Sequence, residues 1–394
     1  MMKSSNNEMI NLSFKKLKIY CENESFKGWD PYDGLNSKVF KALKLNKFSL
    51  TRLAWIQFFK RSSINFRKMM LVEKDYNPKG LGLFLTGYCN LYKINPNEEY
   101  LKKIIFLADK LIELKSEGYS GACWGYNFDW QSRAFFLSKQ TPTVVATSFI
   151  ASALLDAYEI IKDKKYLDIS VSSAEFILKD LNKTYKEEGF IFSYSPYDKT
   201  CVYNASLLGS KILAKIYSYT KNELLLLEAR KSVVACVDAQ REDGAWIYGE
   251  LEIQNWVDSF HTGYNLECIY EYQKYSGDNS FEEAISKGIN YYISNFFLED
   301  GTPKYYDNKI YPIDIHAPAQ FVTTLYKLDL FNENRDLIDK VINWTIINMQ
   351  DKKIGYFYYQ LKNTISSKIP YMRWAQSWMF YAFTFYYLGE KDGK

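Results

Sequence analysis

Residues 244–267 read GAWIYGELEIQNWVDSFHTGYNLE, and this stretch contains the unit that decides the fold. A glycine followed by aromatic residues, Gly244 to Tyr248, leads through a loop into an apolar helix that starts near His261. The same order recurs about every 57 residues along the chain. A steady period of this length predicts a repeated supersecondary unit, here a helical hairpin.

Each repeat has a polar or charged residue at the mouth of its first helix. These residues are Thr147, Asn204, His261, His316 and Arg373, and the aromatic segments before them begin at Gly121, Gly189, Gly244, Gly301 and Gly355. The first helix of a repeat is apolar on nearly every face, as in residues 143–162, whereas its partner, as in 164–182, is amphipathic. Because a helix that is apolar all round must be buried all round, we expect an inner and an outer layer of helices.

The predicted fold is an all-α, (α/α)6 toroid with short β-hairpin-like aromatic loops at the rim of a funnel. Further hairpins are expected at 200–219 with 221–240, 257–276 with 280–297, and 314–328 with 333–350, before a last helix at 371–388. We expect a single domain over residues 1–394, in which 1–75 form an N-terminal extension that completes the ring. An open solenoid is the competing arrangement, but the last helix, Trp374 to Tyr387, is too apolar to face solvent at an open end.

Composition narrows the class of protein. The 394 residues are 47% hydrophobic, without an uninterrupted apolar run of about 18, so a large core and no membrane span are expected. The polar segment Met1 to Phe14 does not resemble a secretory signal, which predicts a cytoplasmic protein unless a leader has been removed. A net charge of +4 with interspersed signs argues against a nucleic-acid surface. The six cysteines form no CxxC pair, and the chain has no P-loop, GxGxxG or HExxH motif, so neither a metal nor a cofactor is expected.

The chain is rich in aromatic residues, with 34 Tyr, 26 Phe and 9 Trp. Such rings suit a concave surface that stacks on sugars, although many of them could simply fill the space between helices. The predicted partner is an oligosaccharide, a polysaccharide or an activated sugar.

Both histidines belong to the series at the helix mouths, which in a closed ring converge on one funnel. Asp258 precedes His261 by three residues, and Asp314 precedes His316 by two. A neighbouring carboxylate can fix the tautomer of an imidazole and raise its basicity, so each histidine is a candidate general base. The alternative is that each caps its own helix or packs against aromatic rings.

The loop of residues 121–133 offers an aromatic platform with charges at its rim. It contains Trp124, Tyr126, Asp129, Trp130 and Arg133. Asp129 and Arg133 either pair with each other or face a ligand, and an arginine that binds carboxylates would favour uronic acids.

The remaining site candidates come from later repeats. Arg133 or Arg373 could hold a uronate carboxylate, and Tyr126 or Tyr248 could return a proton. Further binding candidates are Asn204, Trp246, Trp256 and Gln376, and a carboxylate pair for glycoside hydrolysis could be drawn from Asp129, Glu250, Asp258 and Asp314.

Two resemblances support a glycan-related toroid. Gln240 to Trp246 reads Gln-x3-Gly-x-Trp and resembles the repeat that buttresses triterpene-cyclase toroids, although the Asp-x-Asp-Asp acid motif of those enzymes is absent. Residues 28–37, 60–67, 77–84 and 123–133 resemble bacterial and archaeal polysaccharide-biosynthesis proteins of the VpsJ type.

The VpsJ-type resemblance implies a six-hairpin, glycan-associated protein from a capsule or O-antigen locus. Some members carry the label delta-aminolevulinic acid dehydratase, which does not suit this repeat because it implies a TIM barrel. The six-hairpin superfamily includes uronyl C5-epimerases, polysaccharide lyases, sugar 2-epimerases and glycosidases, so the fold leaves the reaction open.

Three functions follow from the sequence. The first is an enzyme of cytoplasmic polysaccharide assembly that abstracts the C5 proton of a uronate, as an epimerase or a lyase. The second is a glycoside hydrolase, and the third is a non-catalytic glycan-binding or assembly subunit that works with other polysaccharide-assembly proteins.

Overall fold

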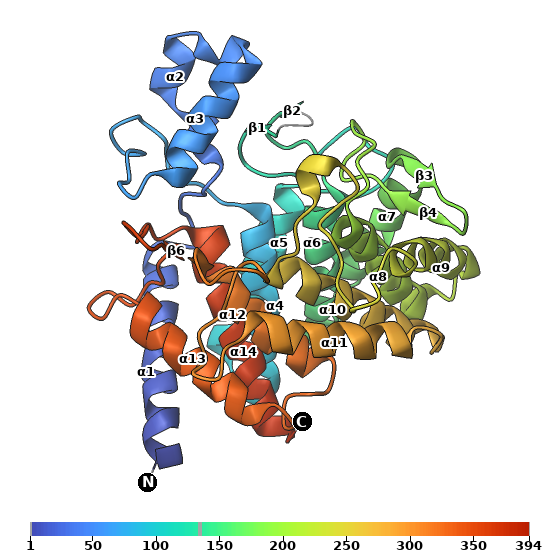
Figure 1. Ribbon diagram of the computed structural model, residues 1–394. Coiled ribbons are helices and arrows are strands. Elements are labelled where there is room, and N and C mark those ends of the chain that lie inside the picture. The colour runs from blue at the N-terminus through green and yellow to red at the C-terminus, as the bar shows by residue number, and fades with distance from the viewer. Residues whose placement is uncertain (1, 133–135, 394) are drawn as a thin grey trace.

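The computed structural model of the protein describes residues 2–132 and 136–393, and this part of the chain forms a ring of helices in two layers (Figure 1). The inner layer consists of α4 (Pro78–Ile94), α6 (Val144–Ile161), α8 (Tyr203–Thr220), α10 (Ser259–Ser276), α12 (His316–Lys327) and α14 (Ser377–Asp392). The outer layer consists of α1 (Met2–Asn23), α5 (Glu98–Glu113), α7 (Lys164–Glu175), α9 (Glu223–Val237), α11 (Glu282–Phe296) and α13 (Arg335–Met349). The alternation of apolar and amphipathic helices therefore becomes two layers, as predicted.

The inner layer closes on itself. Each inner helix packs against the next, and α14 packs against α4, the first of them. The contact is close because Gly87 of α4 faces Phe380 of α14, where an added Cβ would lie 2.6 Å from the ring. This closure confirms the toroid and excludes the open solenoid.

The glycines of the repeat bind each loop to the outer helix of the next hairpin. A Cβ on Gly189 would lie 1.9 Å from the carbonyl oxygen of Lys231 in α9, and one on Gly244 would lie 2.4 Å from that of Lys287 in α11. Only a residue without a side chain can approach a backbone this closely. The last glycine of the series, Gly355, makes the same approach to α1.

The N-terminal helix therefore takes the outer position beside α14, where the chain has no following helix of its own. The glutamines of the repeat agree with this. Gln240 donates to the carbonyl oxygens of Gly244 and Ala284, and Gln350 donates in the same way to those of Gly355 and Ser13 in α1. Helix α1 was not predicted from the sequence, because its first residues are polar and only one face of the helix is buried.

The rim carries short strands and a helical cap, at the end of the ring opposite the C-terminus (Figure 1). Strands β1 (Trp130–Gln131) with β2 (Phe136–Leu137) and β3 (Lys183–Tyr185) with β4 (Phe190–Phe192) form hairpins, whereas β5 (Ile313–Asp314) pairs with β6 (Gln360–Leu361) from a different loop. The cap consists of η1 (Asp33–Asn36), α2 (Lys38–Ala42), η2 (Leu45–Lys47) and α3 (Ser49–Arg61). Short irregular turns complete the described elements: η3 (Phe176–Asp180), η4 (Glu252–Gln254) and η5 (Met372–Gln376).

The core lies between the two layers and along the axis of the ring. Among the described helices, α6 alone is long and apolar enough to span a membrane, and 67% of that segment is buried inside the protein. Its apolarity is explained by its place in the inner layer. All six cysteines are free and buried, as expected for reduced thiols in apolar surroundings.

Candidate active site

A cavity of about 500 Å³ opens at the end of the ring where the inner helices begin. Caps fix these helix starts: Asn77, Thr143 and Asp258 accept backbone N–H groups of α4, α6 and α10, respectively. Most of the lining is aromatic: Tyr32, Tyr126, Phe128, Trp130, Tyr194, Tyr248, Trp256, Phe260, Tyr264, Tyr305, Tyr306 and Trp374. No aspartate or glutamate is among the described residues that line it.

His261 and Asp258 form a dyad at the mouth of α10. One carboxylate oxygen of Asp258 caps the helix by accepting the backbone N–H of His261, at 3.0 Å. The other oxygen lies 2.7 Å from Nδ1 of the His261 ring and also accepts the indole N–H of Trp256, at 2.9 Å. The arrangement fixes the ring with a proton on Nδ1 and leaves Nε2 to accept a proton. The side chain of His261 is 19% exposed, so a ligand can reach it.

His316 lies deeper and is held differently. Its Nε2 lies 2.8 Å from the hydroxyl of Tyr264, and its ring stacks on Phe260 at 4.2 Å. Burial, together with the nearby cations Lys79 and Arg373 and with His261, holds the pKa of His316 well below its usual range. His316 is therefore neutral at neutral pH, and its Nε2 shares a hydrogen bond with the hydroxyl of Tyr264.

The prediction that Asp314 acts on the His316 ring is wrong. Asp314 accepts the backbone N–H of His316 at 3.0 Å and the side-chain N–H groups of Trp374 and Gln360. It is fully buried, and burial raises its pKa to about 6. A spacing of two residues places this carboxylate at the start of the helix and away from the imidazole.

Two predicted tyrosines line the cavity. The ring of Tyr248 stacks on Trp256 at 4.8 Å and lies 4.6 Å from that of His261. The hydroxyl of Tyr126 lies 3.2 Å from that of Tyr194, in a loop two inner helices away from α10. Burial raises the pKa of both Tyr126 and Tyr248, so both remain protonated at neutral pH.

Arg373 reaches the cavity but already has a counter-ion. Its Nε and Nη2 bind the two carboxylate oxygens of Asp30 at 2.5 and 2.8 Å, and both side chains are 4% exposed. This ion pair joins the turn-rich segment 28–37 to the last hairpin. The charge of Arg373 is neutralised within the protein, so it is less suited to hold a carboxylate than its position in the sequence suggests.

The other sequence candidates divide into two groups. Asn204, Trp130 and Trp256 line the cavity. Those that do not line it have local structural contacts: Trp124 and Trp246 donate to the backbone carbonyls of Leu111 and Cys236, Gln376 bonds to the backbone of Phe357, Asp129 accepts the N–H of Lys139, and Glu250 pairs with Lys186. Arg133 lies outside the described residues.

Lys79, Tyr32 and Lys60 are among the cavity residues that sequence reasoning missed. Lys79 lies in the first turn of α4 and lines the cavity floor, while Tyr32 and Lys60 reach it from the cap. Lys79 is the member of the helix-mouth series that belongs to the first inner helix. The helix start at Asn77 and Pro78 was visible, but 68 residues separate Lys79 from Thr147, so the regular period did not include it.

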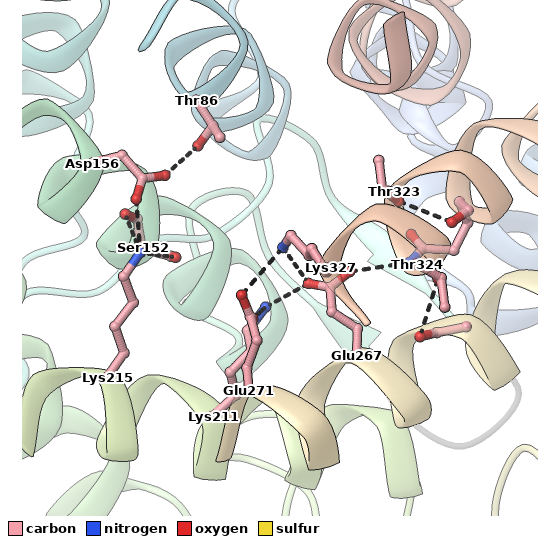
Figure 2. Close-up of polar contacts among 12 residues, drawn as sticks. Thr86, Ser152, Asp156, Lys211, Lys215, Glu267, Glu271, Thr323, Thr324 and Lys327 are labelled. Atoms are coloured by element: carbon pink, nitrogen blue, oxygen red, sulfur yellow. Dashed lines mark hydrogen bonds and ion pairs between the residues drawn. The ribbon is translucent and has the colours of Figure 1, made fainter. Parts of the chain in front are cut away.

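A second cavity, of about 300 Å³, opens at the opposite end of the ring and is lined by charged residues. Figure 2 shows two ionic groups there: Lys215 with Asp156, and Lys211 and Lys327 with Glu267 and Glu271. Although burial opposes it, the pairing with lysines lowers the pKa of both Asp156 and Glu267 to about 2. These buried charges satisfy one another, and they lie below the floor of the aromatic funnel.

The ring is similar to solved structures of enzymes that act on carbohydrates. Cellobiose 2-epimerase from Bacillus thermoamylovorans matches with a TM-score of 0.63 and 13% identity, over 80% of this chain and 88% of that chain. The GH76 α-mannanase from Bacteroides thetaiotaomicron matches with a TM-score of 0.61 and 12% identity, over 82% and 89%. An unsaturated glucuronyl hydrolase specific for heparin matches with a TM-score of 0.59 and 11% identity, also over 82% and 89%.

The fold is therefore the (α/α)6 toroid that these structures share. Identities this low establish the architecture alone. No protein-family model and no curated protein sequence matches the chain, so the resemblance to VpsJ-type proteins remains a prediction.

Proposed function

We propose that this protein abstracts the C5 proton of a uronic acid, in a glycan or an activated sugar, as an epimerase or a lyase. The observation that carries the proposal is the His261–Asp258 dyad, which is accessible in a cavity lined by aromatic rings. Aromatic rings bind the faces of sugars, and an imidazole oriented by a carboxylate is a suitable general base.

In the proposed reaction, Nε2 of His261 takes the proton from C5, and the electron pair of the C–H bond moves into the adjacent carboxylate to give an enolate. Asp258 stabilises the imidazolium that forms. Return of a proton to the opposite face gives the C5 epimer. Tyr126 suits this step because it comes from a loop two inner helices away from α10 and remains protonated.

Elimination would instead break the bond between C4 and its oxygen, and the enolate electrons would form a C4–C5 double bond. Where C5–H and the C4–O bond lie on the same face of the sugar ring, the departing oxygen takes a proton from the side of the base. Tyr248 suits this step because its ring lies 4.6 Å from that of His261.

His261 is preferred to His316 as the base. Nε2 of His316 is occupied by Tyr264, and its Nδ1 is buried without a hydrogen-bond partner among the described residues. His316 therefore supports the floor of the funnel and holds Tyr264.

The cavity lining disfavours glycoside hydrolysis. That reaction needs two carboxyl groups on either side of the scissile bond. Of the four candidates, Asp258 is committed to His261, Asp314 is buried, and Asp129 and Glu250 do not line the cavity.

The proposed biological setting is the cytoplasmic assembly of a capsule or O-antigen polysaccharide together with other assembly proteins, as the VpsJ-type resemblance implies. The similarity of the ring to sugar epimerases and to a glucuronyl hydrolase supports a glycan as the ligand.

The test uses proton NMR of uronate glycans incubated with the protein in D2O. Heparosan, polymannuronate and polygalacturonate cover three configurations of the uronate. An epimerase exchanges C5–H for deuterium, and a lyase gives a 4,5-unsaturated product with ultraviolet absorbance. In either case His261→Gln should abolish the change, whereas His316→Gln should retain part of it.

Two results would overturn the proposal. New reducing ends without deuterium at C5 or ultraviolet absorbance would indicate hydrolysis. Binding of these glycans without any chemical change, equal in the wild type and in His261→Gln, would indicate a non-catalytic binding subunit.

A further inference from the structure

Lys79 is a buried lysine at the floor of the funnel that has no carboxylate partner among the described residues. It is the second residue of α4, is 4% exposed and lines the cavity. Its Nζ lies 4.4 Å from the ring centre of Phe149 and 5.4 Å from those of Tyr264 and Trp378. An aromatic box of this kind attracts a cation, but the attraction is weaker than the cost of removing an ammonium from water.

The two cations nearest to Lys79 are already neutralised. Arg373 is paired with Asp30, and Lys211 with Glu267 at 2.9 Å. Burial first, and then the charge of Arg373, holds the pKa of Lys79 well below its usual range. The funnel floor therefore has a basic group for whose protonated form the described part of the protein supplies no carboxylate counter-ion.

We propose that Lys79 binds the carboxylate of an acidic sugar and selects uronates over neutral sugars. The inference rests on the proposed function and identifies the residue that recognises the acid. A neutral sugar would leave the buried lysine without a partner. A site that leaves a buried polar group unpaired binds the wrong ligand much more weakly than the right one. Arg373, the sequence candidate for this role, is already bound to Asp30.

The position of Lys79 fits the chemistry of the dyad. Its Nζ lies over the ring of Tyr264, and that ring lies 5.8 Å from the ring of His261, one turn away on α10. A carboxylate held against Lys79 would therefore have its attached C5 on the side of His261. The ammonium would also stabilise the negative charge that develops on the carboxylate when the C5 proton leaves.

Binding should be linked to proton uptake. In the empty cavity the depressed pKa favours the neutral amine, and an arriving carboxylate favours the ammonium. Each bound uronate should then bring up to one proton from the buffer, whereas a neutral sugar should bring none.

The experiment compares methyl glucuronide with methyl glucoside, and methyl galacturonide with methyl galactoside, by titration calorimetry at pH 7. Two buffers of different ionisation enthalpy report the protons taken up. The wild type is compared with Lys79→Met and Lys79→Gln. Lys274→Met is the control because Lys274 is an exposed lysine at the opposite cavity, so its loss changes the net charge equally.

The wild type should bind at least one uronide more than 10-fold tighter than its neutral partner, with proton uptake. Both Lys79 variants should lose the preference and the uptake while they retain affinity for the neutral sugar, and Lys274→Met should behave like the wild type. Lys79→Met should also melt at or above the wild-type temperature, because it removes a buried amine that has no carboxylate partner among the described residues.

Each contrary result has a distinct meaning. Equal binding of uronide and neutral sugar by the wild type, or an unchanged preference in the Lys79 variants, overturns the role of Lys79 and leaves sugar binding in place. Binding of neither sugar of either pair by the wild type overturns the proposed function and this inference with it.

Discussion

Removal of one member of the ion pair between Asp30 and Arg373 should be among the most destabilising single changes in the ring. The pair joins residues 343 positions apart, and both side chains are 4% exposed. Removal of one member of such a pair leaves an uncompensated charge in the interior, which costs about 3–5 kcal/mol. Asp30→Asn should approach the upper end of this range, because it leaves Arg373 without a counter-ion.

Arg373→Met should cost less, because the carboxylate of Asp30 keeps a second cation nearby. Arg67 donates to the backbone carbonyl of Asp30 at 2.6 Å and pairs with Asp33 at 2.6 Å. The double variant restores neutrality, so its cost should fall at least 2 kcal/mol below the sum of the single costs. For 394 residues, an unfolding entropy of about 2.1 cal/mol/K per residue gives about 0.8 kcal/mol/K, so a loss of 4 kcal/mol lowers Tm by about 5 °C.

The assay is differential scanning calorimetry of the wild type, both single variants and the double variant. Glu73→Gln is the control because the Lys38–Glu73 pair is exposed on both sides, and it should shift stability by less than about 0.5 kcal/mol. Single variants within 1 kcal/mol of the wild type, or a double variant equal to the sum, would refute the argument that this pair is buried and tightly coupled.

Three further outcomes are expected. Asp258→Asn should lower kcat on a uronate substrate at least about 100-fold, because it removes the carboxylate that orients the His261 ring. Asp314→Asn should lower kcat much less, because Asp314 accepts the backbone N–H of His316 and does not contact the imidazole. Equal effects of the two changes would contradict this assignment of roles. Gly355→Ala should destabilise the ring by more than about 2 kcal/mol in thermal melting, because the added Cβ would lie 2.4 Å from Lys16. Gly118→Ala is the control: Gly118 has a similar positive φ but no neighbouring atom within 4 Å of the added Cβ, so this change should cost only about 1 kcal/mol. The pairing with lysines lowers the pKa of Glu267 to about 2, so at a pH above the unfolded pKa of about 4.3 the ionised carboxylate stabilises the fold by about 3 kcal/mol, and this contribution is lost as the pH falls towards 2. The difference in unfolding free energy between the wild type and Glu267→Gln should therefore become smaller from pH 5 to pH 3. A difference that does not change with pH would contradict the pairing.

The buried ionic groups of Figure 2 bear on where a ligand can bind. Lys211, Lys215 and Lys327 line the second cavity, and each pairs with a carboxylate. Buried charges that are satisfied in this way confer little net stability but penalise alternative packings. They leave Lys79, at the funnel floor, as the cation to which an acidic ligand is the natural partner.

The sequence by itself determined the ring. The repeated order of glycine, aromatic segment and apolar helix predicted the inner and outer helices, because these signals are local and recur at a constant spacing. The observed bounds of the helices differ from the expected ones by a few residues. The same register predicted that Thr147, Asn204, His261, His316 and Arg373 would share one cavity. The last four do, whereas Thr147 does not line the cavity and accepts the backbone N–H of Trp124. Local sequence also predicted that Asp258 lies beside His261, since a residue at the helix cap reaches the third residue of the same helix.

Only the tertiary structure decided which of these groups are free to act. The sequence could not reveal that Asp30 neutralises Arg373, because that contact joins opposite ends of the chain, nor that Tyr264 occupies His316 from a neighbouring helix. It also did not show that α1 completes the outer layer, or that Lys79 lies at the funnel floor with no carboxylate partner in the described part of the chain. Pairing and burial depend on distances between segments remote in sequence, and these are fixed only when the last inner helix meets the first.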